Sequence, residues 1–262
     1  MTKLTSGEIA RYHDQGWIVP DYRVPDAMLR RAQERATTMM ATRPDYRDLY
    51  PDILGADITF IEMAREPDLV VVLEQIIGPD IALWTAGMFG KPAGDGKATP
   101  WHQDGEYWPI RPLKTTTVWV ALDASTRGNG CLRVIPGSHK YGRLFGHHEN
   151  LGENLTLHQE INHAEFDETT AVDIKLEAGQ VSIHDVYLIH GSAPNQSDKR
   201  RAGMTYRYMP ASCHFDRALA ARQATDDKIP NISKRPIYLV HGTGESAPNT
   251  FDPVPSAIND AA

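Results

Sequence analysis

The sequence predicts a mainly β protein with flanking helices, built as a sandwich or barrel rather than as a doubly wound sheet. From about residue 81, short apolar or alternating runs follow one another, separated by Gly, Pro, Asn and Asp. Strands at this spacing are typical of sandwiches and barrels. Before them lie segments with apolar residues at helical spacing. We expect one domain over residues 1–262, with a helical part at 1–80, a strand core at about 81–215 and an irregular tail at 216–262.

The first third of the chain is predicted to be helical. Thr5 can cap the first helix, Gly16 can end it, and Pro25 suits the first turn of the second. Residues 17–19 form a brief extended run, and residues 42–59, rich in Asp, Arg, Pro and Tyr, are expected to be a loop. The predicted helices cover residues 4–16, 25–40 and 66–77.

The strand core contains one long insert at residues 141–170. We expect it to be an active-site flap, since long irregular inserts in compact domains are usually functional. Three of its histidines, His147, His148 and His158, could bind a second metal, but solvated loop histidines are the favoured interpretation. The predicted strands cover residues 81–89, 115–122, 131–135, 171–175, 180–184, 186–189 and 204–209.

Composition narrows the class of protein. Lys and Arg total 27 against 34 Asp and Glu, a formal charge of −7, which argues against general binding to nucleic acid or anionic membranes. The apolar stretch at 69–77 is too short to span a bilayer, and residues 1–13 have no apolar run, so we expect no signal peptide. Cys131 and Cys213 have no CxxC spacing, which favours reduced thiols in a cytoplasmic protein.

The chemistry begins at a His-x-Asp motif, His102-Gln103-Asp104. Side chains at i and i+2 point the same way from a strand, so both can reach one metal ion. A lone match is weak, and His214-Phe215-Asp216 is a second one. Only the first is followed by a suitable distal set: His190 at the end of an apolar run, and Arg201 eleven positions later. We therefore interpret the second match as a decoy.

Two imidazoles and one carboxylate leave three adjacent positions open on a metal, as in non-haem iron(II) oxygenases. A 2-oxo acid can occupy two of them and dioxygen the third. The far carboxylate of the oxo acid then requires a bidentate cation, which Arg supplies better than Lys. These requirements are met together by four residues: His102, Asp104, His190 and Arg201.

These motifs, with the segments at 128–132, 135–139 and 190–195, resemble the phytanoyl-CoA dioxygenase family over most of the chain. The resemblance implies a double-stranded β-helix, the cupin-like jelly roll, and Fe(II) held by His102, Asp104 and His190. It implies that Arg201 binds the distal carboxylate of 2-oxoglutarate. It also suggests roles around the cosubstrate for four further residues: Gln103, Trp119, Ser192 and Asn195.

The expected activity is hydroxylation of an unactivated C–H bond in a small-molecule substrate, with O2 consumed, succinate and CO2 released, and ascorbate stimulating. A non-redox cupin, such as a metal-binding protein or isomerase, would have no need of Arg201. A halogenase is disfavoured because Asp104 is present, whereas a desaturating or ring-closing oxygenase remains open. The substrate class and the oligomeric state are not indicated.

Several neighbouring residues have competing interpretations. His184 also ends a strand, and we expect it to be packed beside the ligands rather than to be one. Trp119 could belong to the core instead of the cosubstrate pocket, and Asn195 could only shape its loop. The residues after the motif are expected at the pocket rim, with Tyr107 and Trp108 alternatively capping the core. That group comprises Glu106, Tyr107, Trp108 and Arg111.

Overall fold

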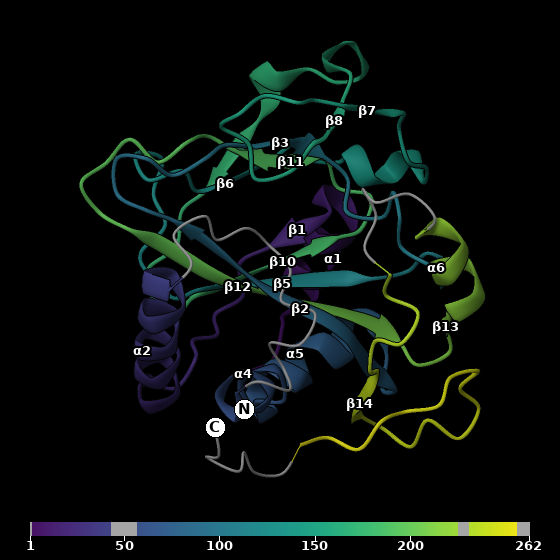
Figure 1. Cartoon of the computed structure of the whole chain (residues 1–262). Coiled ribbons are helices and arrows are strands. Elements are labelled where there is room, and N and C mark those ends of the chain that lie inside the picture. Colours follow the sequence, from purple (N-terminus) through teal and green to yellow (C-terminus); the bar gives the residue numbers. More distant parts are fainter. Residues whose placement is uncertain (1, 43–56, 225–230, 256–262) are drawn as a thin grey trace.

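The computed structural model describes residues 2–42, 57–224 and 231–255, and it contains two main β-sheets with flanking helices (Figure 1). Helices α2, α4 and α5 lie against one face of the larger sheet, and the smaller sheet lies over the other face. The helices are α1 Ser6–Gln15, α2 Asp26–Thr42, α4 Ile58–Ala64, α5 Pro67–Ile77 and α6 Arg217–Gln223. Short 3-10 helices occur at Ser138–Tyr141, His163–Glu165 and Glu168–Thr170.

The larger sheet has six strands in the order β1-β10-β5-β12-β2-β14, and the smaller has four in the order β3-β11-β6-β9. Two-stranded pairs are formed by β13 with β4 and by β7 with β8. The strands are β1 Trp17–Ile18, β2 Ile81–Lys91, β3 Thr99–His102, β4 Ile110–Arg111, β5 Thr116–Ala121, β6 Leu132–Val134, β7 His147–Glu149, β8 Gln159–Ile161, β9 Val172–Ile174, β10 Val181–Asp185, β11 His190–Ser192, β12 Arg201–Pro210, β13 His214–Phe215 and β14 Tyr238–His241. This strand-rich fold with flanking helices confirms the predicted fold class.

The main hydrophobic core lies between the helices and the larger sheet. Leu29, Phe60 and Leu73 from the helices join Val118 and Tyr206 from the sheet in one buried cluster. The expected ends of the first helix are confirmed: Thr5 and Glu8 form a capping box at the start of α1, and Gly16 is its C-cap. Helices α1, α2, α4 and α5 bury their apolar faces in this layer, which supports the larger sheet beneath the site.

Four local expectations differ from the structure. Residues 58–64 form helix α4, which begins at the Asp57 cap, while residues 43–56 of the expected loop lie outside the described part of the chain. Residues 186–189 are not a strand: the amide of Leu188 donates to Asp185 O in a turn. The insert at 141–170 contains the β7–β8 hairpin. The expected irregular tail contains α6, and β14 pairs with β2.

Within the described residues, no helix combines the length and apolar character that a membrane span requires.

Candidate metal centre

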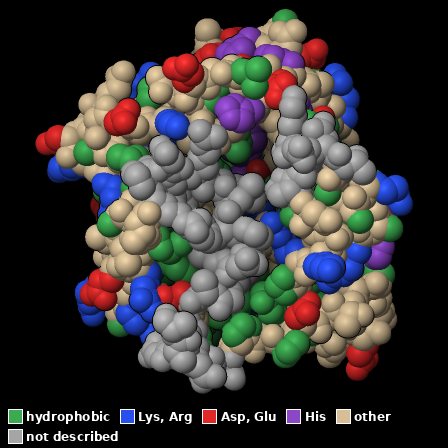
Figure 2. Space-filling model, viewed as in Figure 1, with side chains coloured by type: hydrophobic (Ala, Val, Ile, Leu, Met, Phe, Trp, Pro, Cys, Tyr) green, Lys and Arg blue, Asp and Glu red, His purple; other side chains and the backbone are tan. Residues whose placement is uncertain are grey.

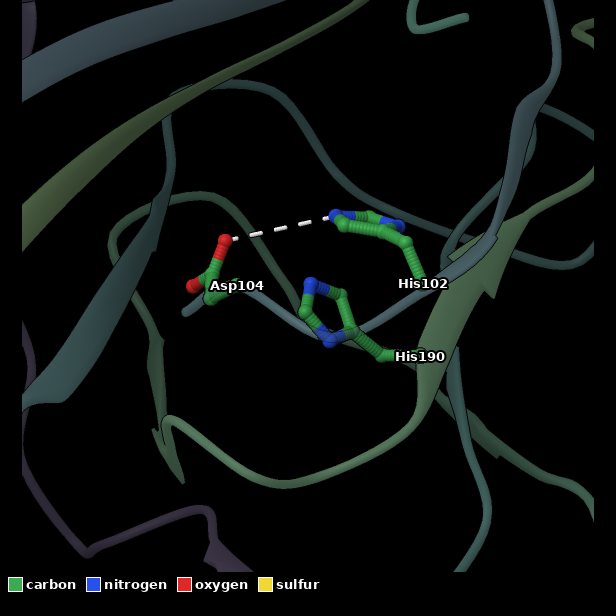
Figure 3. A group of neighbouring side chains, drawn as sticks. All are labelled: His102, Asp104 and His190. Carbon is green, nitrogen blue, oxygen red and sulfur yellow. Dashed lines mark ion pairs between the residues drawn. The ribbon is translucent and has the colours of Figure 1, made fainter. Parts of the chain in front are cut away.

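Two strands of the smaller sheet bring the distant histidines together. His102 ends β3, His190 begins β11, and the two are direct antiparallel partners in the strand register. Their ring centroids lie 4.2 Å apart. Asp104 follows two residues after His102, and its Oδ1 lies 4.0 Å from His102 Nε2. Figure 3 shows the three side chains converging on one point.

The three residues can offer ligand atoms that all lie within 4.8 Å of one another, and all three are buried. Among the described residues, no other group of three or more His, Cys, Asp or Glu side chains has ligand atoms this close together. The decoy interpretation of the second motif agrees with the structure, because Asp216 caps α6 by accepting from the amide of Leu219. His214 in that motif is exposed.

Backbone carbonyls fix which nitrogen each histidine presents. Nδ1 of His102 lies 2.8 Å from Pro100 O, and Nδ1 of His190 lies 2.9 Å from Leu188 O. A carbonyl accepts only, so each Nδ1 carries its hydrogen and each Nε2 is left with a lone pair for a metal.

The protonation states also suit a cation. Burial lowers the pKa of His102, and burial together with His102 and His184 lowers the pKa of His190 well below its usual value. Burial alone would raise the pKa of Asp104, but Arg207 with His184 and His190 holds it well below the usual range. Neutral imidazoles and an ionised carboxylate are what metal binding demands.

Asp104 is also oriented by a neighbour on the larger sheet. The Thr117 hydroxyl on β5 donates to Asp104 Oδ2 over 2.8 Å, which leaves Oδ1 facing the histidines. His184, on β10, lies 3.6 Å from the same Oδ2, and its ring centroid is 4.8 Å from that of His190. His184 is therefore packed beside the ligands, as expected from the sequence.

The site opens into a pocket between the two sheets, with about 440 Å³ of empty volume including its open mouth. Trp119 and Arg201 line it from the larger sheet and Ser192 lines it from the smaller, so three of the residues expected around the cosubstrate face one cavity. The Arg201 guanidinium lies 5.2 Å from the centre of the Trp119 ring and donates to Gly130 O. Burial lowers the pKa of Arg201 to about 10, so it is a cation at neutral pH.

A buried lysine lies next to Ser192 and Arg201. Lys91 Nζ donates to Ser192 Oγ over 2.7 Å and to Ala193 O over 2.6 Å. Even a neutral amine carries two hydrogens, enough for both bonds, so Ser192 Oγ accepts here and its own hydrogen is free to point elsewhere. Burial, reinforced by the neighbouring Arg201 guanidinium, lowers the pKa of Lys91 to about 6.

Two residues expected around the cosubstrate have other roles. Gln103 does not line the pocket; its side-chain nitrogen donates to Arg143 O and Tyr187 O, and its oxygen accepts from the amide of Phe145. That expectation for Gln103 is wrong, because alternation turns it away from the metal and toward the insert. Asn195 donates to three carbonyls, including Lys91 O, and shapes its loop.

Three of the insert histidines face carboxylates rather than one another. His147 Nδ1 lies 3.1 Å from Glu106 Oε2, and His148 and His163 lie 3.6 Å and 3.1 Å from the Glu160 carboxylate. Histidines gather at this end of the molecule, over β7 and β8 (Figure 2). His158 is on the hairpin too, with its Nδ1 3.1 Å from Asn150 O. Among the described residues they form no metal-binding group.

Sequence reasoning missed Lys91, Thr117 and Arg207. Arg207 lies six residues after Arg201 on β12, so the two share a face, and that alternation was a signal available in the sequence. The role of Thr117 could be predicted only with the pairing of β5 and β10, which sets it opposite His184. Lys91 lies at the end of a strand whose apolar character gave no indication of a buried amine.

Known proteins resemble this chain in both sequence and fold. The family model described as phytanoyl-CoA dioxygenase matches residues 12–203. The peroxisomal phytanoyl-CoA dioxygenase of Homo sapiens is 30% identical over 180 residues, 67% of this chain and 51% of that protein. A probable alpha-ketoglutarate-dependent hypophosphite dioxygenase of Stutzerimonas stutzeri is 29% identical over 67% of this chain and 59% of that protein. The chain spans about half the length of the curated relatives it matches.

Solved structures agree on the fold. The non-heme monooxygenase ThoJ superposes with a TM-score of 0.72 and 24% identity, covering 95% of this chain and 88% of that one. CytC3 with Fe(II) and alpha-ketoglutarate superposes with a TM-score of 0.64 and 23% identity, covering 93% and 91%. At these identities the likeness shows a shared double-stranded β-helix. The match over most of the chain shows that it belongs to the phytanoyl-CoA dioxygenase family of iron(II)- and 2-oxoglutarate-dependent oxygenases.

Proposed function

We propose that the protein hydroxylates an unactivated C–H bond of a small molecule, using Fe(II), 2-oxoglutarate and O2. The observation that carries the proposal is the convergence of His102 Nε2, His190 Nε2 and an Asp104 oxygen in a buried pocket that also contains Arg201. When bound, iron(II) and 2-oxoglutarate would supply the oxidising chemistry that inserts one oxygen atom of O2, with succinate and CO2 as coproducts.

The residues of the chain would hold and orient these partners. His102, Asp104 and His190 would bind Fe(II) on one face, with Thr117 keeping the carboxylate turned. Arg201 would pair with the distal carboxylate of 2-oxoglutarate, beside the Trp119 ring and the Ser192 hydroxyl. Because Lys91 already donates to Ser192 Oγ, the serine can donate its own hydrogen to the same carboxylate.

The surroundings of the pocket would exclude water from the reacting carbon. The Gln103 side chain, next to the ligand His102, hydrogen-bonds to the backbone of the insert at 141–170. The backbone of Ala98 also hydrogen-bonds to Asn154 and Thr156 of the insert. We propose that this insert covers the site as a flap during turnover. We also propose a cytoplasmic location, supported by two buried cysteines, Cys131 and Cys213, that are both free thiols.

A succinate-release screen tests the proposal. Purified protein would receive Fe(II), ascorbate and 2-oxoglutarate together with one substrate class at a time, under air. Substrate-dependent succinate with a product 16 mass units heavier is expected from hydroxylation. A product two mass units lighter would instead assign desaturation or ring closure. Metal-bound protein that consumes no O2 with any class would favour the non-redox alternative.

A further inference from the structure

Strand β12 places a second buried arginine in the pocket. Arg201 and Arg207 are 3% and 6% exposed, and both line the same cavity. Alternate residues of a strand share a face, and Cα atoms six residues apart lie about 20 Å from each other along it. The two guanidinium groups therefore serve different ends of the pocket. In the proposed function only Arg201 contacts a bound molecule, and Arg207 acts only through the pKa of Asp104.

Arg207 lies at the metal end. Its Nη2 is 3.6 Å from Asp104 Oδ1, and its guanidinium carbon is 5.2 Å from the centre of the Trp108 ring. The Trp108 ring in turn packs edge-on against Trp84, with centroids 4.8 Å apart. A guanidinium held against an indole and beside a carboxylate has a fixed plane, which suits recognition of a planar or tetrahedral oxyanion.

Charge in the loaded pocket favours an anionic substrate. Among the described residues that line the cavity, Arg201 and Arg207 are cationic and Asp104 is the carboxylate. Iron(II) and the 2-oxoglutarate dianion cancel each other's charge, so the lining retains one positive charge after both have bound. A single negative charge on the substrate would balance the charge of this lining.

A second group points into the same end of the cavity. His184 is 2% exposed and lines the pocket, and neither of its ring nitrogens has a hydrogen-bond partner among the residues that the structure describes. Buried polar atoms are nearly always paired, so an unsatisfied imidazole beside a cavity indicates a polar ligand. His184 and Arg207 both lie 3.6 Å from an oxygen of Asp104, which places them at one end of the pocket.

We propose that Arg207 and His184 form a subsite for an oxyanion of the molecule to be oxidised, which makes the substrate a small organic monoanion. The inference rests on the proposed function and names the substrate class for it. Since Arg207 lies 3.6 Å from a ligand of the metal, the anionic group would lie close to the oxidised carbon. The shared chemistry covers carboxylates, phosphonates and sulfonates.

The competing role for Arg207 is to hold Asp104 alone. Such a residue would affect metal affinity but would not distinguish an oxyanion from a neutral group of the same shape. The experiment therefore measures binding with turnover blocked: Ni(II) replaces Fe(II), and 2-oxoglutarate is kept saturating so that its own site is filled. Calorimetry then follows butanoate, propylphosphonate and the neutral butanamide. Arg127→Gln, at an exposed surface arginine, removes the same charge as the control.

In the wild type and in Arg127→Gln, butanoate or propylphosphonate should bind at least about tenfold more tightly than butanamide. Arg207→Gln should lose that preference by at least about tenfold, the loss of one charge-assisted pair, while its affinity for 2-oxoglutarate is kept. Whichever of the two anions binds more tightly identifies the preferred group. An equal affinity for butanamide in the wild type, or a preference that survives in Arg207→Gln, would overturn the subsite.

If Arg207→Gln does not fold, the comparison of the anions with butanamide in the wild type decides the question. Arg207→Lys, which keeps the charge, should then retain part of the preference for the anions. Binding of 2-oxoglutarate to the Ni(II)-loaded wild type is measured first. Failure of that step would overturn the proposed function and the subsite together. Normal binding of 2-oxoglutarate without any preference for an anion would overturn the subsite only.

Discussion

Replacing Lys91 by Met should change how the stability of the protein depends on pH. Lys91 is buried beside Arg201, and its pKa in the folded protein is lowered to about 6, from 10.5. Between these two values the unfolded chain binds a proton at Lys91 that the folded protein does not. Stability must therefore rise with pH across this window, and the cost of burying the amine disappears above the unfolded pKa.

The magnitude follows from the width of the window. Each pH unit between the two pKa values changes the free energy of unfolding by about 1.4 kcal/mol. From pH 7 to pH 9, the wild type should gain about 2.7 kcal/mol relative to Lys91→Met. Packing differences and the lost hydrogen bonds to Ser192 and Ala193 do not depend on pH, so they cancel in this comparison.

Urea unfolding of both metal-free proteins at pH 7, 8 and 9 would measure the effect. A difference between them that stays constant within about 0.5 kcal/mol would show that Lys91 keeps its proton in the fold, and would refute the reasoning. Calorimetry gives a second readout. A carboxylate bound on Arg201 offsets the repulsion on Lys91, so 2-oxoglutarate should bind with proton uptake at pH 7 in the wild type and without it in Lys91→Met.

Three further substitutions test the site. Asp104→Ala should lower metal affinity by more than about 100-fold and abolish succinate formation, and unchanged metal binding would remove Asp104 from the ligand set. Arg201→Leu should weaken 2-oxoglutarate binding by about 2–4 kcal/mol, about 30- to 1,000-fold, at unchanged metal affinity. An unaltered KM for 2-oxoglutarate would assign Arg201 a structural role. Gly203→Ala would place its Cβ 2.1 Å from the Trp119 ring, so we expect a lower Tm and weaker 2-oxoglutarate binding. The control is Gly7→Ala, whose Cβ would have its nearest neighbour 3.9 Å away and should change neither quantity.

The strands and helices with clear periodicity could be predicted from the sequence, because their apolar residues meet one buried layer. Strand β2 and helix α5 are examples, each within two residues of its expected bounds. The run at 186–189 could not be assigned in this way. Val186, Leu188 and Ile189 are all buried, but they follow a turn at Asp185 and lie in no strand. Apolar character reports burial, and burial does not require a strand.

The metal ligands could be predicted because their residue types and spacing satisfy one chemical demand. Gln103 was misassigned by proximity in sequence, although alternation places it opposite His102 and Asp104. The place of Lys91 depends on the register that pairs it with Arg201 on the neighbouring strand. The spacing of Arg207 to Arg201 indicates its face of the strand, but not its contact with Asp104. Such contacts come from strand pairing over long sequence separations, which a single sequence does not reveal.

An anaerobic spectroscopic titration tests the shared metal and cosubstrate site most directly. Fe(II) and then 2-oxoglutarate would be added to the metal-free protein, with Asp104→Ala measured alongside. If His102, Asp104 and His190 hold Fe(II) and Arg201 orients the cosubstrate, a weak visible charge-transfer band should develop with 2-oxoglutarate in the wild type only. A flat spectrum in the wild type, or an equal band in Asp104→Ala, would contradict this assignment.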